Sequence, residues 1–392
     1  MKFKDIQKND NKISFIVEDI DVSILNSIRR TILSDIPNVA FDFEPYEFDN
    51  KKVDIITNTC SLHNEIILQR LSMIPLKFTE NEISDFDPLK YKFKLSKTNN
   101  TNKMLNVTTG DIQIFDENNK KYPDSFIRKI FPKNKISDDF ILLTKLKPNN
   151  YDKDKGDSIE INMIASKKTA KDYAGFGYVS QCVYHNIVDK DKAKQALKEL
   201  KEKNKNLNSK ELEDLEKDFN TLDKFRHFKT NKYDEPNSFQ FDIESEARVS
   251  PEYLFFKSIE IIKGRLQRLL ENIIDNKITI NKIKNTENLY EFIIENEGHT
   301  IGNLIQSILY NIHIRENEKK DINFIGYKCP HPLENTLIIN IRFTNNINST
   351  EVNAIFRKGI TDIQDILDNI NKKWIDKSKV DKNIKEISDY IS

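Results

Sequence analysis

Two pairs of cysteine and histidine are the first candidates for chemistry. Cys60-x-x-His63 and Cys329-x-His331 could together supply the two thiolates and two imidazoles of a tetrahedral zinc site. The Cys-x-His spacing argues against zinc, because structural zinc sites use longer spacings. The alternative is that Cys60 is a small buried residue and His331 a hydrogen-bonding loop residue. We therefore predict no metal and no cofactor.

His299 is the second candidate, because it could act as a general base together with Glu295 or Glu297. Neither a nucleophile motif nor a glycine-rich phosphate loop accompanies it. We interpret His299 as a turn residue that orients a strand-to-helix corner. The sequence predicts no catalytic residues, so we expect that the chain is not an enzyme on its own.

The stretch around His299 occurs twice in the chain. Residues 15–33 (FIVEDIDVSILNSIRRTIL) and 292–310 (FIIENEGHTIGNLIQSILY) align without a gap at an offset of 277. Each copy predicts a short apolar strand, a polar turn, a Ser or Thr that can cap, and an amphipathic helix. A solenoid repeats every 20–50 residues or so, which is far shorter. The repeat predicts two related domains that pack as the subunits of a dimer would.

The two copies differ in charge rather than in burial. At 100° per residue, one stripe of the first helix holds its apolar residues, Ile24, Leu25, Ile28, Ile32 and Ile36. Asn26 and Arg30 point the opposite way, and Arg29 lies at the edge of the stripe. The second copy has Gln306 and Ser307 in the arginine positions. The arginines are either solvated, or one of them pairs bidentately with a partner's carboxylate.

Composition excludes several classes of protein. The 392 residues suggest two or three domains, and the 62 basic and 62 acidic residues give no net field for nucleic acid. Cys60, Cys182 and Cys329 are too few and too scattered for a disulfide framework. We find no signal-like start and no apolar run of about 18 residues. We expect a soluble intracellular protein that does not contact membranes. Direct DNA binding is not the first interpretation, although a local basic patch is left open.

Two long helices are predicted to pair. The helix that starts at Ser250-Pro251 has apolar residues at steps of 4, 3, 4, 3 and 4, namely Phe255, Ile259, Ile262, Leu266, Leu269 and Ile273. The helix at about 351–375 is expected to turn its own apolar residues inward, namely Ile355, Ile363, Ile366, Ile370 and Trp374. Each seam would be exposed alone, so we expect them to cover each other.

The chain between the repeats divides into two kinds of sequence. Residues 77–165 read as short strands between polar turns, which predicts a β-rich domain. Residues 189–218 alternate lysine with acidic residues and predict an exposed helical arm with i,i+4 charge pairs. The alternative for the arm is a solvated excursion without a partner. Residues 277–288 are expected to be a junction.

These motifs together resemble the alpha-like subunits of DNA-directed RNA polymerase. The first half is similar to the third-largest eukaryotic subunit, its archaeal counterpart and the bacterial alpha amino-terminal domain. Four motifs carry this similarity: Asn26-x-x-Arg29-Arg30; Asn58-Thr59-x-Ser61-Leu62-x-x-Glu65-x4-Arg70-Leu71-x-x-Ile74-Pro75-Leu76; Val107-Thr108-Thr109-Gly110-Asp111-Ile112; and Ala165-x-Lys167-Lys168-x-Ala170-Lys171-Asp172-x-Ala174. The second half is similar to the eleventh eukaryotic subunit and its archaeal counterpart, in Glu297-x-His299-Thr300-x-Gly302-Asn303 and Gly326-Tyr327-x-x-Pro330-His331-Pro332-Leu333-Glu334. One chain with both resembles the fused subunit of large nucleocytoplasmic DNA viruses.

The resemblance implies an α+β fold with two dimerisation domains of antiparallel sheet plus helices, paired within the chain as a pseudo-dimer. The first domain would be formed by 1–48 and 237–276 and interrupted by a β-rich inserted domain at 49–236, whose charged helical arm is at about 189–235. The second domain would be 277–392. In the family, such a pair is the platform for two large catalytic subunits, beside small subunits. The resemblance implies that the protein is located inside the cell as part of a polymerase. If the source is viral, that location is the host cytoplasm and the virion.

The resemblance also implies site residues. The subunit interface would include Asn26, Arg29, Arg30, Glu65, Arg70, Leu71, Lys168 and Asp172. The pseudo-dimer would use Phe255, Ile259, Ile262, Leu266, Leu269, His299, Gly302, Asn303, Ile363, Ile366 and Ile370. Two features depart from the family: the inserted domain lacks its zinc-binding cysteine cluster, and Tyr173-Ala174-Gly175-Phe176 replaces a His-Ala-Lys-Trp run. The alternatives are a stand-alone pseudo-dimeric interaction module and a hydrolase or metalloenzyme.

Overall fold

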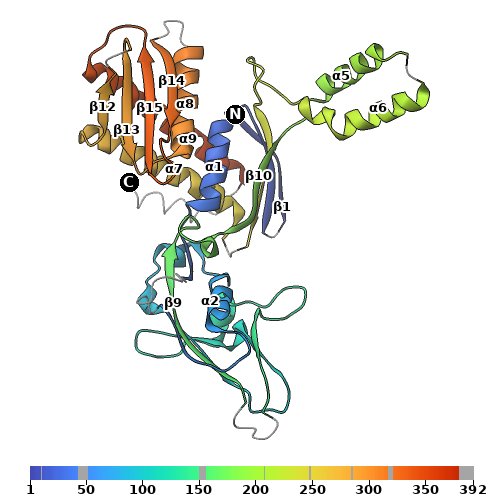
Figure 1. The fold of residues 1–392 in the computed structure, drawn as a ribbon, viewed down its shortest axis with the longest axis vertical. Helices are drawn as coiled ribbons and strands as arrows, with labels where there is room; N and C mark the ends of the chain where they lie inside the picture. The colour runs from blue at the N-terminus through green and yellow to red at the C-terminus, as the bar shows by residue number, and fades with distance from the viewer. Residues whose placement is uncertain are drawn as a thin grey trace. The chain divides into compact units, whose positions relative to one another are not determined.

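The chain forms two compact units in the computed structural model (Figure 1). The structure describes residues 1–9, 11–42, 52–149, 156–206, 208–246, 249–283, 286–316 and 321–378. Unit 1 comprises Met1–Ile32, Gln181–Glu244 and Pro251–Ser392, and unit 2 comprises Leu33–Ser180 and Ser245–Ser250. The expected inserted domain at 49–236 differs from this division, because residues 181–236 lie in the unit that contains both repeats.

The first repeat of unit 1 is a four-stranded sheet with two helices. Its strand order is β1 (Lys2–Asn9), β2 (Lys12–Glu18), β11 (Ser238–Ser245) and β10 (Val179–Asn186), and its helices are α1 (Val22–Ser34) and α7 (Pro251–Ile274). The alternating residues of β2 and β11 bury one face of the sheet, with Phe15, Val17, Phe239, Phe241 and Ile243 all fully buried. Antiparallel pairing of Phe15 with Phe241 sets the register of these two strands.

The second repeat has the same strand order. Its sheet runs β12 (Thr279–Lys282), β13 (Leu289–Glu295), β15 (Thr336–Phe343) and β14 (Ile322–Lys328), with helices α8 (His299–Tyr310) and α9 (Ser349–Ser378). A π-helical turn, Asn311–Arg315, continues α8. The strands β12, β13, β15 and β14 therefore correspond to β1, β2, β11 and β10, and α8 and α9 correspond to α1 and α7. The chain has an α+β fold built on antiparallel strand pairs, as expected.

Two insertions make the first repeat longer than the second. In the first repeat, unit 2 lies between α1 and β10, and the charged arm lies between β10 and β11. The arm is a helical hairpin of α5 (Lys190–Lys203) and α6 (Ser209–Thr221) that extends from the sheet (Figure 1). Lys201 of α5 pairs with Glu216 of α6, so this ion pair joins the helices rather than successive turns of one helix. The arm is helical, as predicted, but among the ion pairs of the described residues none joins charges at i,i+4 within α5 or α6.

Unit 2 is β-rich, as the sequence predicts. The long strand β9 (Ser158–Lys168) is its centre and pairs with β3 (Asn38–Phe41), β4 (Val53–Asn58) and β5 (Lys92–Thr98), and β5 pairs with β7 (Ile112–Phe115). A separate pair is β6 (Leu105–Thr108) with β8 (Leu142–Leu146). The short helices of the unit are α2 (Asn64–Ser72), α3 (Glu80–Ser84) and α4 (Asp124–Ile130), of which α2 contacts β3 and β4, and α4 contacts β7. The alternating run VAFDFEPYEF, residues 39–48, also predicts a strand, and its part from Phe43 onward lies outside the described residues.

Three strands have no clear signal in the sequence. Strand β1 is polar and has a register shift at Asp5, where φ is 48°. Strand β12 occupies part of the expected junction at 277–288. Strand β10 has no clear alternation, since one of its eight residues is fully buried. All three are outer strands of their sheets, where pairing on one side suffices and a strong apolar pattern is unnecessary.

The capping prediction was wrong by two residues in both helices. Asp21, rather than Ser23, precedes α1 and accepts hydrogen bonds from the Ser23 backbone N–H (2.8 Å) and hydroxyl (2.5 Å). Helix α8 starts at His299, with Gly298 before it and Thr300 already in the first turn. The carboxylate of Asp21 is as good a cap as a hydroxyl, and its earlier position is enough to extend the helix.

Candidate functional site: the pairing surface of the two repeats

The long helices α7 and α9 lie side by side in unit 1 (Figure 1). All six predicted seam residues of α7 are buried, Phe255, Ile259, Ile262, Leu266, Leu269 and Ile273. The buried residues of α9 follow the same steps of 4, 3, 4, 3 and 4, at Phe356, Ile360, Ile363, Leu367, Ile370 and Trp374. Such matched spacing keeps both stripes in contact along the helices.

The predicted seam of α9 needs a correction at two positions. Ile363, Ile370 and Trp374 are buried, but Ile355 and Ile366 are half-buried. Phe356 and Leu367, their neighbours in sequence, take the inner positions. Residue type alone puts Ile355 and Ile366 in the seam. The spacing of 4, 3, 4, 3 and 4 residues that α7 uses places Phe356 and Leu367 in the seam instead.

Trp374 brings the second repeat into the aromatic core of the first. Its ring centroid lies 4.4 Å from that of Phe255, 4.6 Å from Phe15 and 5.1 Å from Phe3. The indole N–H donates to the backbone carbonyl of Glu252 (3.0 Å), so its polar atom is satisfied as well. The core is thus one structure made by both halves of the chain.

Polar contacts flank the apolar seam. Arg265 of α7 makes a two-pronged ion pair with Glu297, which precedes α8, and both side chains are largely buried. Asn371 of α9 donates to Glu260 of α7 (2.7 Å), and Lys263 pairs with Asp368 (2.6 Å). These contacts fix the helices at one register, because each joins a specific residue of one repeat to a specific residue of the other.

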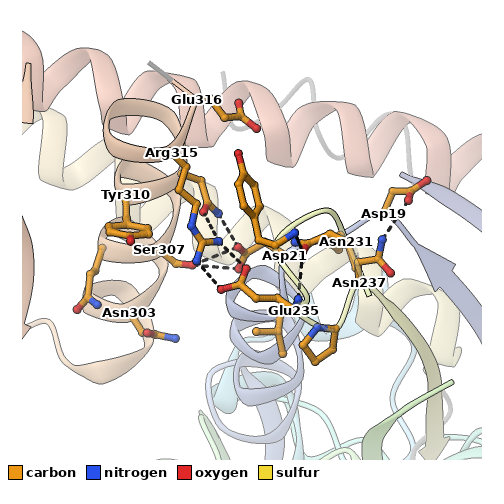
Figure 2. A pocket seen from close by; sticks show the side chains of 16 residues that line it. Asp19, Asp21, Asn231, Glu235, Asn237, Asn303, Ser307, Tyr310, Arg315 and Glu316 are labelled. Carbon is orange, nitrogen blue, oxygen red and sulfur yellow. Dashed lines mark hydrogen bonds and ion pairs between the residues drawn. The ribbon is translucent and has the colours of Figure 1, made fainter. Parts of the chain in front are cut away.

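The repeated helices α1 and α8 also contact each other, in antiparallel directions. Arg30 Nε donates to the hydroxyl of Thr300 (2.9 Å), near the start of α8. At the other end, Asp21 accepts from the hydroxyl of Ser307 (3.2 Å) and from the side-chain amide of Asn311 (2.8 Å) (Figure 2). The helix pair thus has a polar contact near each end.

The predicted interface residues of α1 have partners within the chain. Arg29 donates twice to the side-chain oxygen of Asn26, one turn earlier on the same helix (3.1 and 3.0 Å). Arg30 is exposed but reaches Thr300 of the second repeat. Helical geometry alone predicts that Arg30 points away from the apolar stripe, which it does. Nothing in the local sequence indicates that a second helix lies on that side.

Gly302 and His299 adjust how α8 packs on its own sheet. A Cβ atom at Gly302 would lie 2.6 Å from Leu337 Cδ1 and 2.7 Å from Tyr327 Cδ2, so a larger residue would push the helix away. His299 is exposed, and its Nδ1 lies 3.4 Å from the Tyr327 hydroxyl. Asn303 follows on the same helix and lines the groove described next. The three residues lie together on one helix.

A groove of about 550 Å³ lies between α8 and the base of the arm (Figure 2). Arg315 crosses it, with its guanidinium between the rings of Tyr233 (4.8 Å) and Tyr310 (4.9 Å) and a two-pronged ion pair to Glu235. Hydrogen bonds from Arg315 hold the pKa of Glu235 below its usual range. This contact attaches the base of the arm to the second repeat, and no sequence motif points to it.

The other predicted interface residues lie in unit 2. Arg70 donates to the backbone carbonyl of Leu143 (2.6 Å), Leu71 is fully buried, and Glu65 is exposed. Asp172 accepts from the Thr169 N–H and hydroxyl, which lowers its pKa. Arg70 and Leu71 thus support the fold of unit 2 locally, while Glu65 faces solvent.

Lys168 is part of a buried charge cluster in unit 2. It pairs with Asp42 (2.8 Å), as does Lys52 (2.8 Å), and the carboxylate is almost completely buried. Burial raises the pKa of Asp42, but hydrogen bonds from Lys168 and Lys52 outweigh it, so the pKa lies below its usual value. The lysine ties β9 to the end of β3, a structural role that the sequence does not indicate.

The residues considered for metal chemistry do not form a cluster in the described part of the chain. No group of three or more His, Cys, Asp or Glu there could hold a metal ion. Cys60 Sγ contacts the side-chain oxygen of Asn58 (2.6 Å) instead. Within the same described residues, none of the helices is both long and apolar enough to span a membrane.

Two matches to one protein family coincide with the two repeats. The RNA polymerase Rpb3/Rpb11 dimerisation domain matches residues 14–266 and, in a second model of that domain, residues 290–373. The chain belongs to this family. The first match begins at β2 and ends inside α7, around unit 2 and the arm, and the second covers β13 to α9. The pairing surface described above is therefore formed by two family domains in one chain.

Curated relatives resemble different parts of the chain. The Rpo3 subunit of DNA-directed RNA polymerase from Thermococcus kodakarensis is 39% identical over 90 residues, 23% of this chain and 31% of the relative. RPAC1 of RNA polymerases I and III from Mus musculus is 23% identical over 316 residues, 68% of this chain and 83% of the relative. RPAC2 from Saccharomyces cerevisiae is 34% identical over 88 residues, 22% and 55%. The chain thus spans under a third of the archaeal relative.

Proposed function

We propose that this chain is a non-catalytic assembly subunit of a multisubunit DNA-dependent RNA polymerase. The observation that carries the proposal is the shared core of α7 and α9, in which Trp374 of one family domain packs among Phe3, Phe15 and Phe255 of the other. Such a core makes one rigid body from two domains whose relatives are polymerase subunits. A rigid pair is suited to position larger subunits, and it needs no cofactor.

The docking surface in this proposal is the outer side of α1. Arg29 is only half-buried, and its contact with Asn26 leaves guanidinium N–H groups for a partner's carboxylate. Arg30 borders the second repeat and would be a lesser contributor. The partners would be the two large catalytic subunits, beside small subunits, with Asn26, Glu65, Arg70, Lys168 and Asp172 as further contact residues. Leu71 is fully buried, so it supports unit 2 from inside and is no longer proposed as a contact. DNA would be reached only through the complex.

The finer context is also a proposal. Both domains in one chain resemble the fused subunit of large nucleocytoplasmic DNA viruses, which would place the protein in the host cytoplasm, at viral factories, and in the virion. The competing function is a stand-alone interaction module that uses the same intrachain pair. It is favoured only by the exposed arm, α5 and α6, which the shorter second repeat does not have.

The two helices of the repeat offer a matched experiment. At the constant offset of 277, Arg29 corresponds to Gln306. We expect that Arg29→Gln leaves the chain folded, because exposed or half-exposed substitutions usually change stability by under about 0.5 kcal/mol. If Arg29 pairs with a large subunit, its loss should weaken docking by about 2–5 kcal/mol. The measurement is recovery of the large subunits with the tagged chain from cells that contain the complex.

Gln306→Ala is the control, because it changes the corresponding position in the second repeat. It should leave recovery of the large subunits nearly unchanged. Equal recovery with Arg29→Gln and Gln306→Ala would mean that the charge on α1 is merely solvated. Absence of any large subunit with the unaltered chain would favour the stand-alone module.

A further inference from the structure

A second concave site lies within unit 2. It is a pocket of about 340 Å³ between the turn Thr109–Asp111, the start of β7 and helix α4. Its walls include the rings of Phe131 and Phe140, and Gly110 forms the edge. A Cβ atom at Gly110 would lie 2.6 Å from Phe140 Cδ2, so only glycine lets the turn approach this ring.

The charges around the pocket leave one cation unmatched. Asp111 is held by Lys97 (2.6 Å) and by the Thr108 N–H (2.8 Å), and Asp124 is paired with Lys121 (3.0 Å). Among the ion pairs formed by described residues, none includes Arg128, which is exposed on α4 and lines the pocket. An unmatched guanidinium beside two rings favours a ligand with a carboxylate.

A buried hydroxyl in the wall also lacks a partner. Thr109 is 1% exposed, and its hydroxyl oxygen has no hydrogen-bond partner in the described structure. The backbone N–H of Thr109 donates to the carbonyl of Ile141 (2.9 Å), so the hydroxyl is the group of Thr109 that is left without a hydrogen bond. A buried polar group without a partner is costly, and a bound acceptor would remove that cost once a small shift of the pocket wall uncovers the hydroxyl.

Two exposed apolar residues directly follow the pocket residue Phe140 in the chain. Ile141, bonded to Thr109, is 46% exposed, and Leu142, paired with Thr108 across β6 and β8, is 42% exposed. A small carboxylate would fill the pocket and leave both side chains in water. A polypeptide with an acidic residue beside apolar residues would cover them as well, which gains hydrophobic stabilisation.

We propose that this pocket binds an Asp or Glu side chain of an extended segment from a partner polypeptide. Arg128 pairs with the carboxylate, Phe131 and Phe140 contact its stem, and Ile141 and Leu142 cover the flanking apolar residues. The identity of the partner rests on the proposed function, in which it is another polymerase subunit. The pocket itself lies within unit 2 and does not depend on assembly.

The test is a selection of displayed random nonapeptides on the purified full chain. We expect enrichment of Asp or Glu at one position next to an apolar residue. Binding of a selected peptide should weaken about tenfold or more with Arg128→Gln, and likewise when its acidic residue becomes Asn or Gln. Thr109→Val should weaken binding less, and Arg128→Lys should retain part of it. Lys129→Gln, the neighbouring exposed lysine, is the matched control and should bind normally.

Three results would overturn the proposal: no acidic position in the selected peptides, the same enrichment on Arg128→Gln, or free glutarate competing as well as the peptide itself. The last would mean a small carboxylate ligand rather than a polypeptide. Circular dichroism of each variant establishes that it is folded. Because the selection uses the purified chain, failure to enter a polymerase leaves its outcome unchanged.

Discussion

The two repeats of unit 1 share one plan but differ in their connections. Both order their strands alike and place one short and one long helix at equivalent positions. The first repeat accepts unit 2 after α1 and the arm after β10, whereas the second has short links at both places. Insertions are therefore confined to connections, while the seams of α7 and α9 keep identical spacing. Loop ends tolerate inserted chain far better than a packed seam does.

The helices α1 and α8 differ more subtly, in the polar residues of their contact. Asp21 accepts hydrogen bonds from Ser307 and Asn311. The corresponding residue of the second repeat is Gly298, which has no side chain and cannot make the equivalent contact to α1. Arg30 reaches Thr300, while its counterpart Ser307 serves Asp21 instead. A true two-fold dimer would repeat each contact. Here the pairing is asymmetric, so each repeat is specific for the other.

The largest effect is expected where the repeats share a core. Trp374→Ala removes the ring that packs on Phe15 and Phe255 and should lower the free energy of unfolding by about 3–5 kcal/mol. Urea unfolding followed by circular dichroism measures it. Lys372→Ala, on the exposed side of the same helix, should change stability by less than about 0.5 kcal/mol. Similar values for both variants would mean that α9 contributes no shared core.

The buried face of α9 with Trp374 and its exposed face with Lys372 illustrate which features of the fold a sequence can predict. Strong alternation identifies β2, β11 and β13, and apolar steps identify both long helices, because burial selects residue types at fixed periods. The weakly patterned strands β1, β10 and β12 cannot be recognised in the sequence, since an outer strand needs little burial. Polar contacts such as Arg315 with Glu235 and Arg30 with Thr300 join residues 80 and 270 positions apart. No local pattern encodes such a pair.

The next effect concerns the ion pair between Arg265 and Glu297, which joins the repeats. The exposed fractions of these side chains are 16% and 12%, so losing either partner leaves a poorly solvated charge. Arg265→Ala and Glu297→Ala should each cost about 1–3 kcal/mol of stability. The double variant should cost at least about 0.5 kcal/mol less than the sum. Fluorescence of Trp374, the single tryptophan, reports unfolding.

The more exposed pair Lys263–Asp368 provides the comparison, because it also joins α7 to the second repeat, here to α9, with Asp368 44% exposed. Removing either partner there should cost only about 0.2–1 kcal/mol. Strict additivity of Arg265→Ala and Glu297→Ala would contradict a direct coupling between them. Equal losses for the buried and the exposed pair would contradict the role given to burial.

The smallest effect comes from His313, in the π-helical turn that follows α8. It is 9% exposed, and neither ring nitrogen has a hydrogen-bond partner in the described structure. Burial lowers the pKa of His313 below its usual value, although Asp321 and Asp362 oppose this and Lys358 assists. Counting back 277 residues gives Ile36, which is buried and apolar. The second repeat therefore has a titratable group where the first has none.

His313→Ile removes that difference and should change how stability depends on pH. Because the pKa of His313 is lower in the folded state, the unfolded chain binds the proton first as the pH falls. The contribution of His313 to stability is therefore lost from about pH 6.5 downward, until its lowered folded pKa is reached. His313→Ile should be as stable as the unaltered chain or slightly more stable at pH 7.5. Its advantage should grow at pH 5.5 in urea unfolding. Parallel pH profiles for His313→Ile and the unaltered chain would mean that His313 finds a hydrogen-bond partner in solution.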